Sequence, residues 1–264
     1  MSYETILVER RGTIGIIKLN RPQQRNALGA QLIDDVIKAL HDFDDAPEVH
    51  VIVIMSNLPR VFSAGRDLAE GSSALAADVM KQREISSGPL RLWLTLRSLK
   101  KVVIAAVNGY ALAGGTGLAT CCDLVVAAED AVFGLPEINV GLFPMTIAPT
   151  MARNIASLKK CLELFLTGDR FSAQEAASIG LVNKVVPSDK LEEATMELAE
   201  KIASKSPTTL QMGKQFFYTM LDMEYTQAIK YAHEVISILA VSEDGIEGQK
   251  AFIEIREPQW KKLT

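Results

Sequence analysis

Disulfide, metal and membrane signals are all missing from this sequence of 264 residues. It contains three cysteines, Cys121, Cys122 and Cys161, which cannot build a disulfide framework and suit a reducing compartment. Its three histidines show no metal-ligand spacing. No apolar run approaches the roughly 20 residues that a membrane span needs. The sequence therefore argues against a disulfide-rich, a metal-binding or a membrane-spanning protein.

An excess of basic residues is missing as well. Lys and Arg together number 28 against 32 Asp and Glu, a formal net charge of −4, so we expect no nucleic-acid partner. The first residues, Met1 to Thr5, have neither a basic start nor an apolar signal core, from which we expect a cytoplasmic location. The sequence also lacks a Gly-x-Ser-x-Gly elbow and a Walker A motif, which argues against the hydrolases and nucleotide-binding proteins that carry them.

Strand-like and helix-like patterns alternate in the first half of the chain. Runs of β-branched and apolar residues predict strands over residues 6–9, 13–19, 51–55, 101–107 and 124–127. Arg11-Gly12, between the first two, is typical of a hairpin turn. Apolar residues at helical spacing predict a helix over residues 30–44. This alternation is typical of an α/β fold.

The second half of the chain has mostly helical patterns. From residue 146 onward the only strand predicted is 181–186. Pro207 predicts a break between a helix that ends near Ser204 and one that begins near Thr208, because proline has no amide hydrogen to donate. Earlier in the chain, the Ser-Ser-Gly-Pro run at residues 86–89 predicts the interruption of a helix.

Two glycine-containing turns each follow a predicted buried strand. One covers residues 62–68, after the strand at 51–55, and the other covers 108–117, after the strand at 101–107. Glycine lets backbone amides approach a ligand, and amides at the start of a helix add the positive end of its dipole. Two such amides directed at one oxygen would form an oxyanion hole. Taken singly, each turn fits an ordinary loop better than a ligand site.

Further segments extend this pattern along nearly the whole chain. They cover residues 19–22, 26–28, 62–68, 105–123, 133–138, 141–144, 166–168, 173–176 and 180–182. In their order and spacing they resemble the crotonase superfamily, the enoyl-CoA hydratase/isomerase family. The resemblance implies a crotonase (ClpP-like) spiral of ββα units that binds acyl-CoA over residues 1–200. It also implies a C-terminal helical trimerisation region over residues 201–264.

The same resemblance implies the ligand and the assembly. Members of the family bind acyl-CoA thioesters, so we expect an acyl-CoA substrate. Coenzyme A is then part of the substrate, and we expect no separate cofactor and no metal. We also expect a homotrimer, or a hexamer built as a dimer of trimers, and no nucleic-acid or membrane partner.

The site residues are carried over position by position from the resemblance. The backbone amides of Arg66 and Gly114 are expected to hold the thioester carbonyl, because an enolate oxygen that forms there needs preorganised donors. Glu137 is the expected catalytic acid/base. The residues expected at the substrate are Gln24, Arg25, Ala27, Ala64, Gly65, Asp67, Leu68 and Gly115. Candidates to line the acyl pocket are Trp93, Phe143 and Met145.

The sequence departs from the hydratases of this family at Gly117. Those hydratases use two glutamates, since one carboxylate orients and deprotonates the water while the other exchanges the α-proton. Here Glu137 matches the second glutamate, and Gly117 stands at the position of the first. A single carboxylate beside an oxyanion hole can still remove a proton α to the thioester and return it elsewhere. We therefore expect isomerisation of the double bond of an enoyl-CoA in fatty acid metabolism.

Two other functions remain open. One is an enoyl-CoA hydratase in which a nonstandard group orients the water, and Gly117 counts against it. The other is a catalytically weak homologue that binds acyl-CoA or a protein partner. Retention of both Gly114 and Glu137 counts against this last function, because a binding module has no need of a base.

Overall fold

The computed structural model describes residues 3–67 and 78–261, and it contains a long mixed sheet. The strand order is β1-β2-β3-β5-β7-β10. The strands are β1 (Ile6–Arg11), β2 (Ile14–Leu19), β3 (Val51–Ser56), β5 (Val102–Val107), β7 (Leu124–Ala128) and β10 (Lys184–Val186). β1 and β2 form the predicted antiparallel hairpin, and the other neighbours are parallel. Central parallel strands are buried on both faces, which explains why they read as apolar runs.

A second sheet of four short strands was not predicted. Its order is β4-β6-β8-β9, with β4 (Val61–Ser63), β6 (Tyr110–Leu112), β8 (Val132–Gly134) and β9 (Arg170–Ser172). β4, β6 and β8 are parallel, and each follows a long strand within a few residues. Three residues are too few to show the alternation by which a strand is found in sequence. The succession of a long strand, a short strand and a helix confirms the ββα spiral that the resemblance implied.

Helices surround the two sheets. α1 (Ala30–Asp45) packs against β1, β2 and α3 (Val79–Ser98), while α8 (Leu191–Ala203) covers β3, β5 and β7. α4 (Gly114–Cys121) contacts strands of both sheets, and its residues from Gly115 to Cys121 are buried. α4 is therefore a central helix, which holds the sheets in a fixed relation to each other.

The predicted interruption at residues 86–89 is wrong, because α3 runs through it with Pro89 inside the helix. A Cβ atom added to Gly88 would lie 3.2 Å from Ile33 Cδ1, so this glycine allows α3 to approach α1 closely. The C-terminal half of α3 buries Leu92, Trp93 and Leu96. Burial of each such side chain stabilises by about 1.5–3 kcal/mol, which together outweighs the cost of about 3 kcal/mol for a proline within a helix.

The second half departs from the sequence prediction in its strands but not in its helices. β9 was missed. Of the strand predicted over residues 181–186, only Lys184–Val186 forms a strand, β10. In this half of the chain, α8 is preceded by α5 (Ala148–Asn154), α6 (Leu158–Thr167) and α7 (Ala173–Ser178). The break at Pro207 is confirmed, since α8 ends at Ala203 and Pro207 is the first residue of the next helix. Short 3-10 helices are η1 (Pro22–Gln24), η2 (Pro136–Val140) and η3 (Ser188–Lys190).

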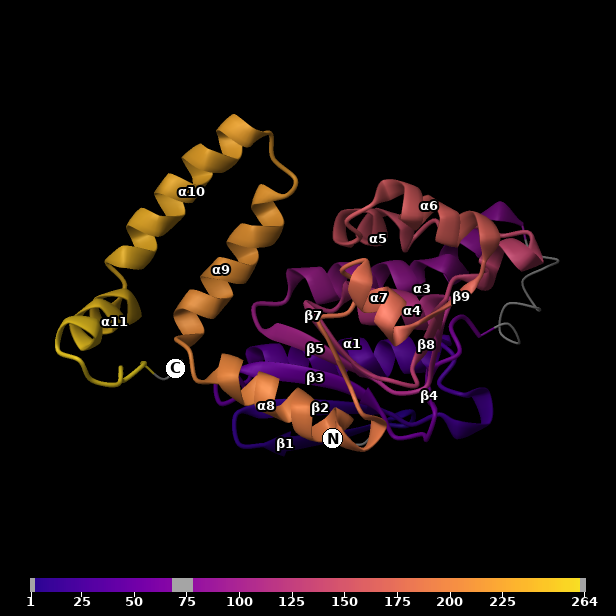
Figure 1. The fold of residues 1–264 in the computed structure, drawn as a ribbon, viewed down its shortest axis with the longest axis horizontal. Helices are drawn as coiled ribbons and strands as arrows, with labels where there is room; N and C mark the ends of the chain where they lie inside the picture. The colour runs from indigo at the N-terminus through magenta and orange to yellow at the C-terminus, as the bar shows by residue number, and fades with distance from the viewer. Residues whose placement is uncertain (1–2, 68–77, 262–264) are drawn as a thin grey trace.

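The last three helices extend from one side of the α/β body (Figure 1). They are α9 (Pro207–Met220), α10 (Tyr225–Ala240) and α11 (Glu243–Ile253). α10 contains no buried residue in this single chain, and Ile229, Ile236 and Ile238 are exposed on it. The division predicted between residues 200 and 201 would fall within the last turn of α8, and it stays a prediction. Among the described residues, no helix is long and apolar enough to cross a membrane.

Candidate active site

Three neighbouring segments carry the predicted catalytic residues, and each follows a strand of the small sheet. Arg66 follows β4, Gly114 follows β6 and Glu137 follows β8. Because β4, β6 and β8 are parallel, their carboxyl ends meet at one edge, which is where ligands of parallel sheets bind. The sequence placed the two glycine turns directly after the long strands β3 and β5. The structure corrects this, since the short strands β4 and β6 intervene and direct the turns to a common edge.

The two turns touch each other through glycine. A Cβ atom on Gly65 would lie 2.6 Å from Leu112 O and 3.1 Å from the amide nitrogen of Gly114. Gly65 also has φ +93°, which side-chain-bearing residues rarely adopt. A Cβ atom on Gly114 would lie only 3.6 Å from the amide nitrogen of Arg66. The absence of side chains at these two positions is thus what brings the Arg66 and Gly114 amides close together.

Both amides are available as donors. Within the described part of the chain, neither the Arg66 nor the Gly114 N–H donates a hydrogen bond to another residue. Arg66 forms a bridge with Leu28, but the bonds of that bridge run from Leu28 N to Gly65 O and from Asp67 N to Leu28 O. Gly114 is the first residue of α4, where amides have no partner within the helix and form the positive end of its dipole. Two free, adjacent donors are what an oxyanion hole requires.

The turn before α4 is strained and is held by hydrogen bonds. Ala113 has φ 49° and ψ −122°, a conformation that costs an L residue about 1–3 kcal/mol. Its amide donates to Gly134 O at 2.8 Å. The buried Thr116 hydroxyl donates to Ala111 O at 2.7 Å or Gly134 O at 2.9 Å, and it accepts from Gly134 N at 3.2 Å. These bonds fix the turn that carries Gly114 against β8, the strand that leads to Glu137.

Glu137 lies in η2 with one carboxylate oxygen unpaired. Pro136 begins this short helix, and Glu137 O accepts the amide of Leu142 at 3.0 Å. The Oε2 atom is buried and has no hydrogen-bond partner among the residues that the structure describes. Burial raises the pKa of the Glu137 carboxyl above its usual range, because the charged form is poorly solvated there. A half-buried carboxylate of raised pKa suits the removal and return of a proton.

Arg66, Gly114 and Glu137 all line one cavity of about 400 Å³. Glu137 contributes the one carboxylate among the described residues of its lining. Most of the wall is apolar, as expected of a site for an acyl chain. Trp93, Phe143 and Met145, the candidates for the acyl pocket, all belong to it. Sequence reasoning did not assign Leu28, Pro89 or Ile147 to the cavity, although Leu28 lies in the segment 26–28 and Pro89 in the run at residues 86–89.

The space beside Gly117 is already filled. A Cβ atom added there would lie 2.9 Å from both Cδ1 and Cγ1 of Ile147, and 3.2 Å from Cζ2 of Trp93. Contacts shorter than about 3.0 Å force a neighbour to move. A second carboxylate at this position is therefore absent from the sequence, and any side chain there would have to displace Ile147 from the space it now fills.

Of the remaining predicted substrate residues that the structure describes, Ala64 alone lines the cavity. Asp67 is buried and forms an ion pair with Arg21 at 2.6 Å. Gly115 is buried against the backbone of Ser63, which leaves no room for a Cβ atom. Gln24 and Arg25 are exposed, whereas Ala27 and Gly65 are buried. Leu68 lies outside the described residues.

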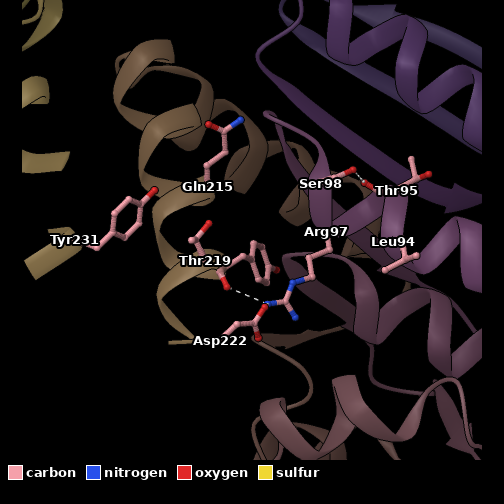
Figure 2. A pocket seen from close by; sticks show the side chains of 9 residues that line it. Leu94, Thr95, Arg97, Ser98, Gln215, Thr219, Asp222 and Tyr231 are labelled. Atoms are coloured by element: carbon pink, nitrogen blue, oxygen red, sulfur yellow. Dashed lines mark hydrogen bonds and ion pairs between the residues drawn. The ribbon is translucent and has the colours of Figure 1, made fainter. Parts of the chain in front are cut away.

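A second cavity, of about 660 Å³, is lined by residues of α3, α9 and α10 (Figure 2). Arg97 of α3 points toward Asp222, which lies just after α9, and their charged groups are 2.7 Å apart. The Arg97 guanidinium also lies over the Tyr218 ring, 5.2 Å from its centre. None of the predicted catalytic residues lines this cavity. No cluster of three or more potential metal ligands occurs in residues 3–67 and 78–261.

Comparison with known proteins shows the family of the chain. Residues 9–263 match the family model of enoyl-CoA hydratase/isomerase. A probable enoyl-CoA hydratase of Mycobacterium tuberculosis is 37% identical over 261 residues, covering 98% of this chain and 99% of the relative. The mitochondrial enoyl-CoA hydratase of Pongo abelii is 37% identical over 263 residues, covering 98% of this chain and 89% of the relative.

Solved structures agree as well. The human enoyl coenzyme A hydratase domain-containing protein 3 superposes with a TM-score of 0.92 at 34% identity, covering 97% of this chain and 100% of that chain. An enoyl-CoA hydratase subunit from Geobacillus kaustophilus gives 0.91 at 35% identity, covering 99% of both chains. The fold is therefore that of the crotonases, as the sequence predicted. The chain belongs to the enoyl-CoA hydratase/isomerase family of enzymes.

Proposed function

We propose that this enzyme moves the double bond of an enoyl-CoA thioester from the β,γ to the α,β position. The observation that carries the proposal is the single carboxylate of the cavity, Glu137, together with the filled space beside Gly117. A double-bond shift needs one group that takes a proton and gives it back. Hydration needs in addition a group that orients water, and the packing of Ile147 and Trp93 stands where the family's hydratases hold it.

The reaction proceeds through an enolate. The thioester carbonyl oxygen accepts hydrogen bonds from the Arg66 and Gly114 amides, and the Glu137 carboxylate takes a proton from C2 of a 3-enoyl thioester. The C–H electron pair moves into the C2–C1 bond, and negative charge collects on the carbonyl oxygen, where the two amides stabilise it. The protonated Glu137 then donates the same proton to C4. The C3–C4 π pair forms the new C4–H bond, the C1–C2 pair moves to C2–C3, and the carbonyl re-forms. A 2-enoyl thioester results without any cofactor.

Steady-state kinetics with two substrates test the proposal. We expect rapid conversion of 3-hexenoyl-CoA to the conjugated 2-enoyl product, followed by ultraviolet absorbance, and at least a hundredfold lower kcat/KM for hydration of crotonyl-CoA. In a fraction of turnovers the proton that reaches C4 should be the one taken from C2. A substrate deuterated at C2 should therefore yield product that carries deuterium at C4 in light water. Efficient crotonyl-CoA hydration that survives Glu137→Gln would contradict the proposed mechanism.

Hydration is the second candidate, because the relatives named above are called enoyl-CoA hydratases. It requires a water-orienting group other than a carboxylate at residue 117. Crotonyl-CoA hydration as fast as isomerisation, and abolished by Glu137→Gln, would select this function. Tight acyl-CoA binding without turnover of either substrate would instead select a binding protein.

Assembly and location are further parts of the proposal. The exposed apolar residues Ile236, Ile238 and Phe252 of α10 and α11 support burial of this helical region against other subunits. We expect a homotrimer or a hexamer, and light scattering after size-exclusion chromatography measures which. A cytoplasmic location also stays a prediction, and some relatives are called mitochondrial.

A further inference from the structure

The loop at residues 25–28 holds the peptide unit that carries the Arg66 amide. Leu28 N donates a hydrogen bond to Gly65 O at 2.6 Å. A peptide unit is planar and trans, so its carbonyl and its N–H point in opposite directions. The Arg66 N–H belongs to the same peptide unit as Gly65 O, and it therefore points away from the Leu28 amide. The backbone of Leu28 thus sets the direction of one of the two expected oxyanion donors.

Two buried polar side chains, those of Asn26 and Ser63, hold this loop in place. The Ser63 hydroxyl donates to Asn26 O at 2.7 Å and accepts from Gly65 N at 3.2 Å. The Asn26 carboxamide accepts from Arg21 N at 2.8 Å through Oδ1, and its Nδ2 donates to Phe62 O at 3.0 Å. One connected set of hydrogen bonds therefore joins the loop to the end of β4 and to the turn that follows β4.

The backbone of the loop is strained next to the cavity. Arg25 has φ 50° and Asn26 has φ 54°, in the left-handed region that residues other than glycine adopt rarely. Such a conformation persists only where the surrounding structure determines it. Leu28, two residues further on, lines the same cavity as Arg66. Without the bonds of Asn26 and Ser63, the loop could relax and Gly65 O would lose its fixed partner.

We propose that Asn26 and Ser63 are positioning residues, which act through Leu28 to fix the direction in which the Arg66 N–H donates. The inference rests on the proposed function, in which this amide holds the thioester oxygen. Neither Asn26 nor Ser63 is among the residues that line the cavity, so an effect on the reaction must pass through the backbone. Donors that stabilise a developing charge must be preorganised, and a misplacement of about 1 Å can cost on the order of a hundredfold in rate.

Two variants, Ser63→Ala and Asn26→Gly, test the inference by kinetics. Glycine adopts the left-handed backbone readily, so Asn26→Gly removes the carboxamide bonds without adding strain. We expect isomerase kcat to fall about tenfold to a hundredfold in each variant while KM stays within about twofold, because the amide acts on charge that develops in the transition state. The two losses should not add in the double variant, since both act through one loop. A changed KM with an unchanged kcat in both variants would overturn the inference.

A saturated thioester gives a readout that needs no turnover. Hydrogen bonds lower the stretching frequency of a carbonyl, so difference infrared spectra of bound hexanoyl-CoA, ¹³C-labelled at its thioester carbonyl, report the oxyanion donors. We expect a lowered frequency on the wild-type protein and a smaller lowering on Ser63→Ala and Asn26→Gly. Equal frequencies on the wild type and Ser63→Ala would refute the inference even if Asn26→Gly does not fold. A shift that depends on Ser63, in a protein that isomerises no 3-enoyl thioester, would support the inference and contradict the proposed function.

Ser206→Ala is the matched control. Ser206 is also buried, and its hydroxyl donates to Asp244 Oδ2 at 2.6 Å and accepts from Thr209 N at 2.9 Å, at the start of α9 and outside the cavity. Like Ser63→Ala, this change removes one donated and one accepted hydrogen bond, so both variants should unfold at a lower urea concentration. Ser206→Ala should leave kcat per folded molecule and the carbonyl frequency unchanged. An equal loss of kcat in the two variants would attribute the effect to lost stability and would overturn the inference.

Discussion

α3 contributes residues to both cavities, and the carboxylates near the two cavities differ in their hydrogen bonding. Near the cavity between α3 and α9, Asp123 binds Lys214 Nζ at 2.7 Å through Oδ2 and the Tyr218 hydroxyl at 2.8 Å through Oδ1. The same Oδ2 accepts the amide of Val103 at 2.7 Å. In the active-site cavity, Glu137 Oε2 has no partner within the described residues. One carboxylate is fully paired, and the other has an oxygen without a partner.

This difference separates stability from function. The Asp123–Lys214–Tyr218 cluster joins α9 to the start of β7 and to the loop before β5, where Lys214 also donates to Lys101 O at 2.8 Å. Its burial is compensated by hydrogen bonds, as a buried ion pair requires. The unpaired oxygen of Glu137 is a cost to folding that the fold carries at its ligand site. Substitutions in the two regions should therefore change different properties.

The largest effect is expected from Glu137→Gln. The amide cannot take a proton from C2, so isomerase kcat should fall about a thousandfold, within the range for loss of a general acid–base group. Stability should not fall, because the lost charge has no partner. Glu163→Gln, on the exposed surface of α6, is the control and should keep full activity. A loss of less than tenfold in Glu137→Gln would exclude Glu137 as the acid/base.

Asp123→Ala should have the opposite profile. Removal of one partner from a buried ion pair costs about 3 kcal/mol, since the Lys214 charge and the Tyr218 hydroxyl would be left unpaired. Chemical denaturation measures this loss, and kcat per folded molecule should stay within about twofold of wild type because no active-site residue is touched. Asp222→Ala is the matched control, because its pair with Arg97 is half-exposed and should contribute less than about 1 kcal/mol. Equal losses in the two variants would contradict the comparison.

The sequence predicted Glu137 and several other residues of the cavity, but not how the space beside Gly117 is filled. Glu137, Arg66 and Gly114 lie in short motifs, and the long strands are apolar runs, so both could be recognised locally. Neither Trp93 nor Ile147 carries any sign that it fills the space beside Gly117, because that contact joins α3, α4 and the segment before α5. The Asp123–Lys214 pair is 91 residues apart in the chain, and no local pattern connects such partners. The three-residue strands were missed for the reason that they are too short to show a period.

Gly117→Ala should disturb the active-site wall moderately. The added methyl group would meet Ile147 at 2.9 Å, and overpacking of this kind costs about 1–3 kcal/mol. Gly213→Ala in α9 is the control, because nothing lies within 4 Å of its added Cβ atom and alanine favours a helix by about 1 kcal/mol. Thermal denaturation should thus show opposite shifts for the two changes. If Ile147→Ala fails to restore part of the stability of Gly117→Ala, Ile147 is not the residue that excludes a side chain there.

The smallest effect is expected in the pH dependence of stability. Burial raises the pKa of Glu137 in the folded chain above its value in the unfolded chain, so the folded state binds more protons between the two values. The contribution of this group is therefore fully present below the unfolded pKa and is lost as pH rises through the folded pKa. Glu137→Gln removes that loss, so the variant should gain stability relative to wild type as pH rises through this interval. Urea denaturation at a series of pH values measures the difference, and a gain that appears instead as pH falls would show that Glu137 is stabilised in its charged form by a partner.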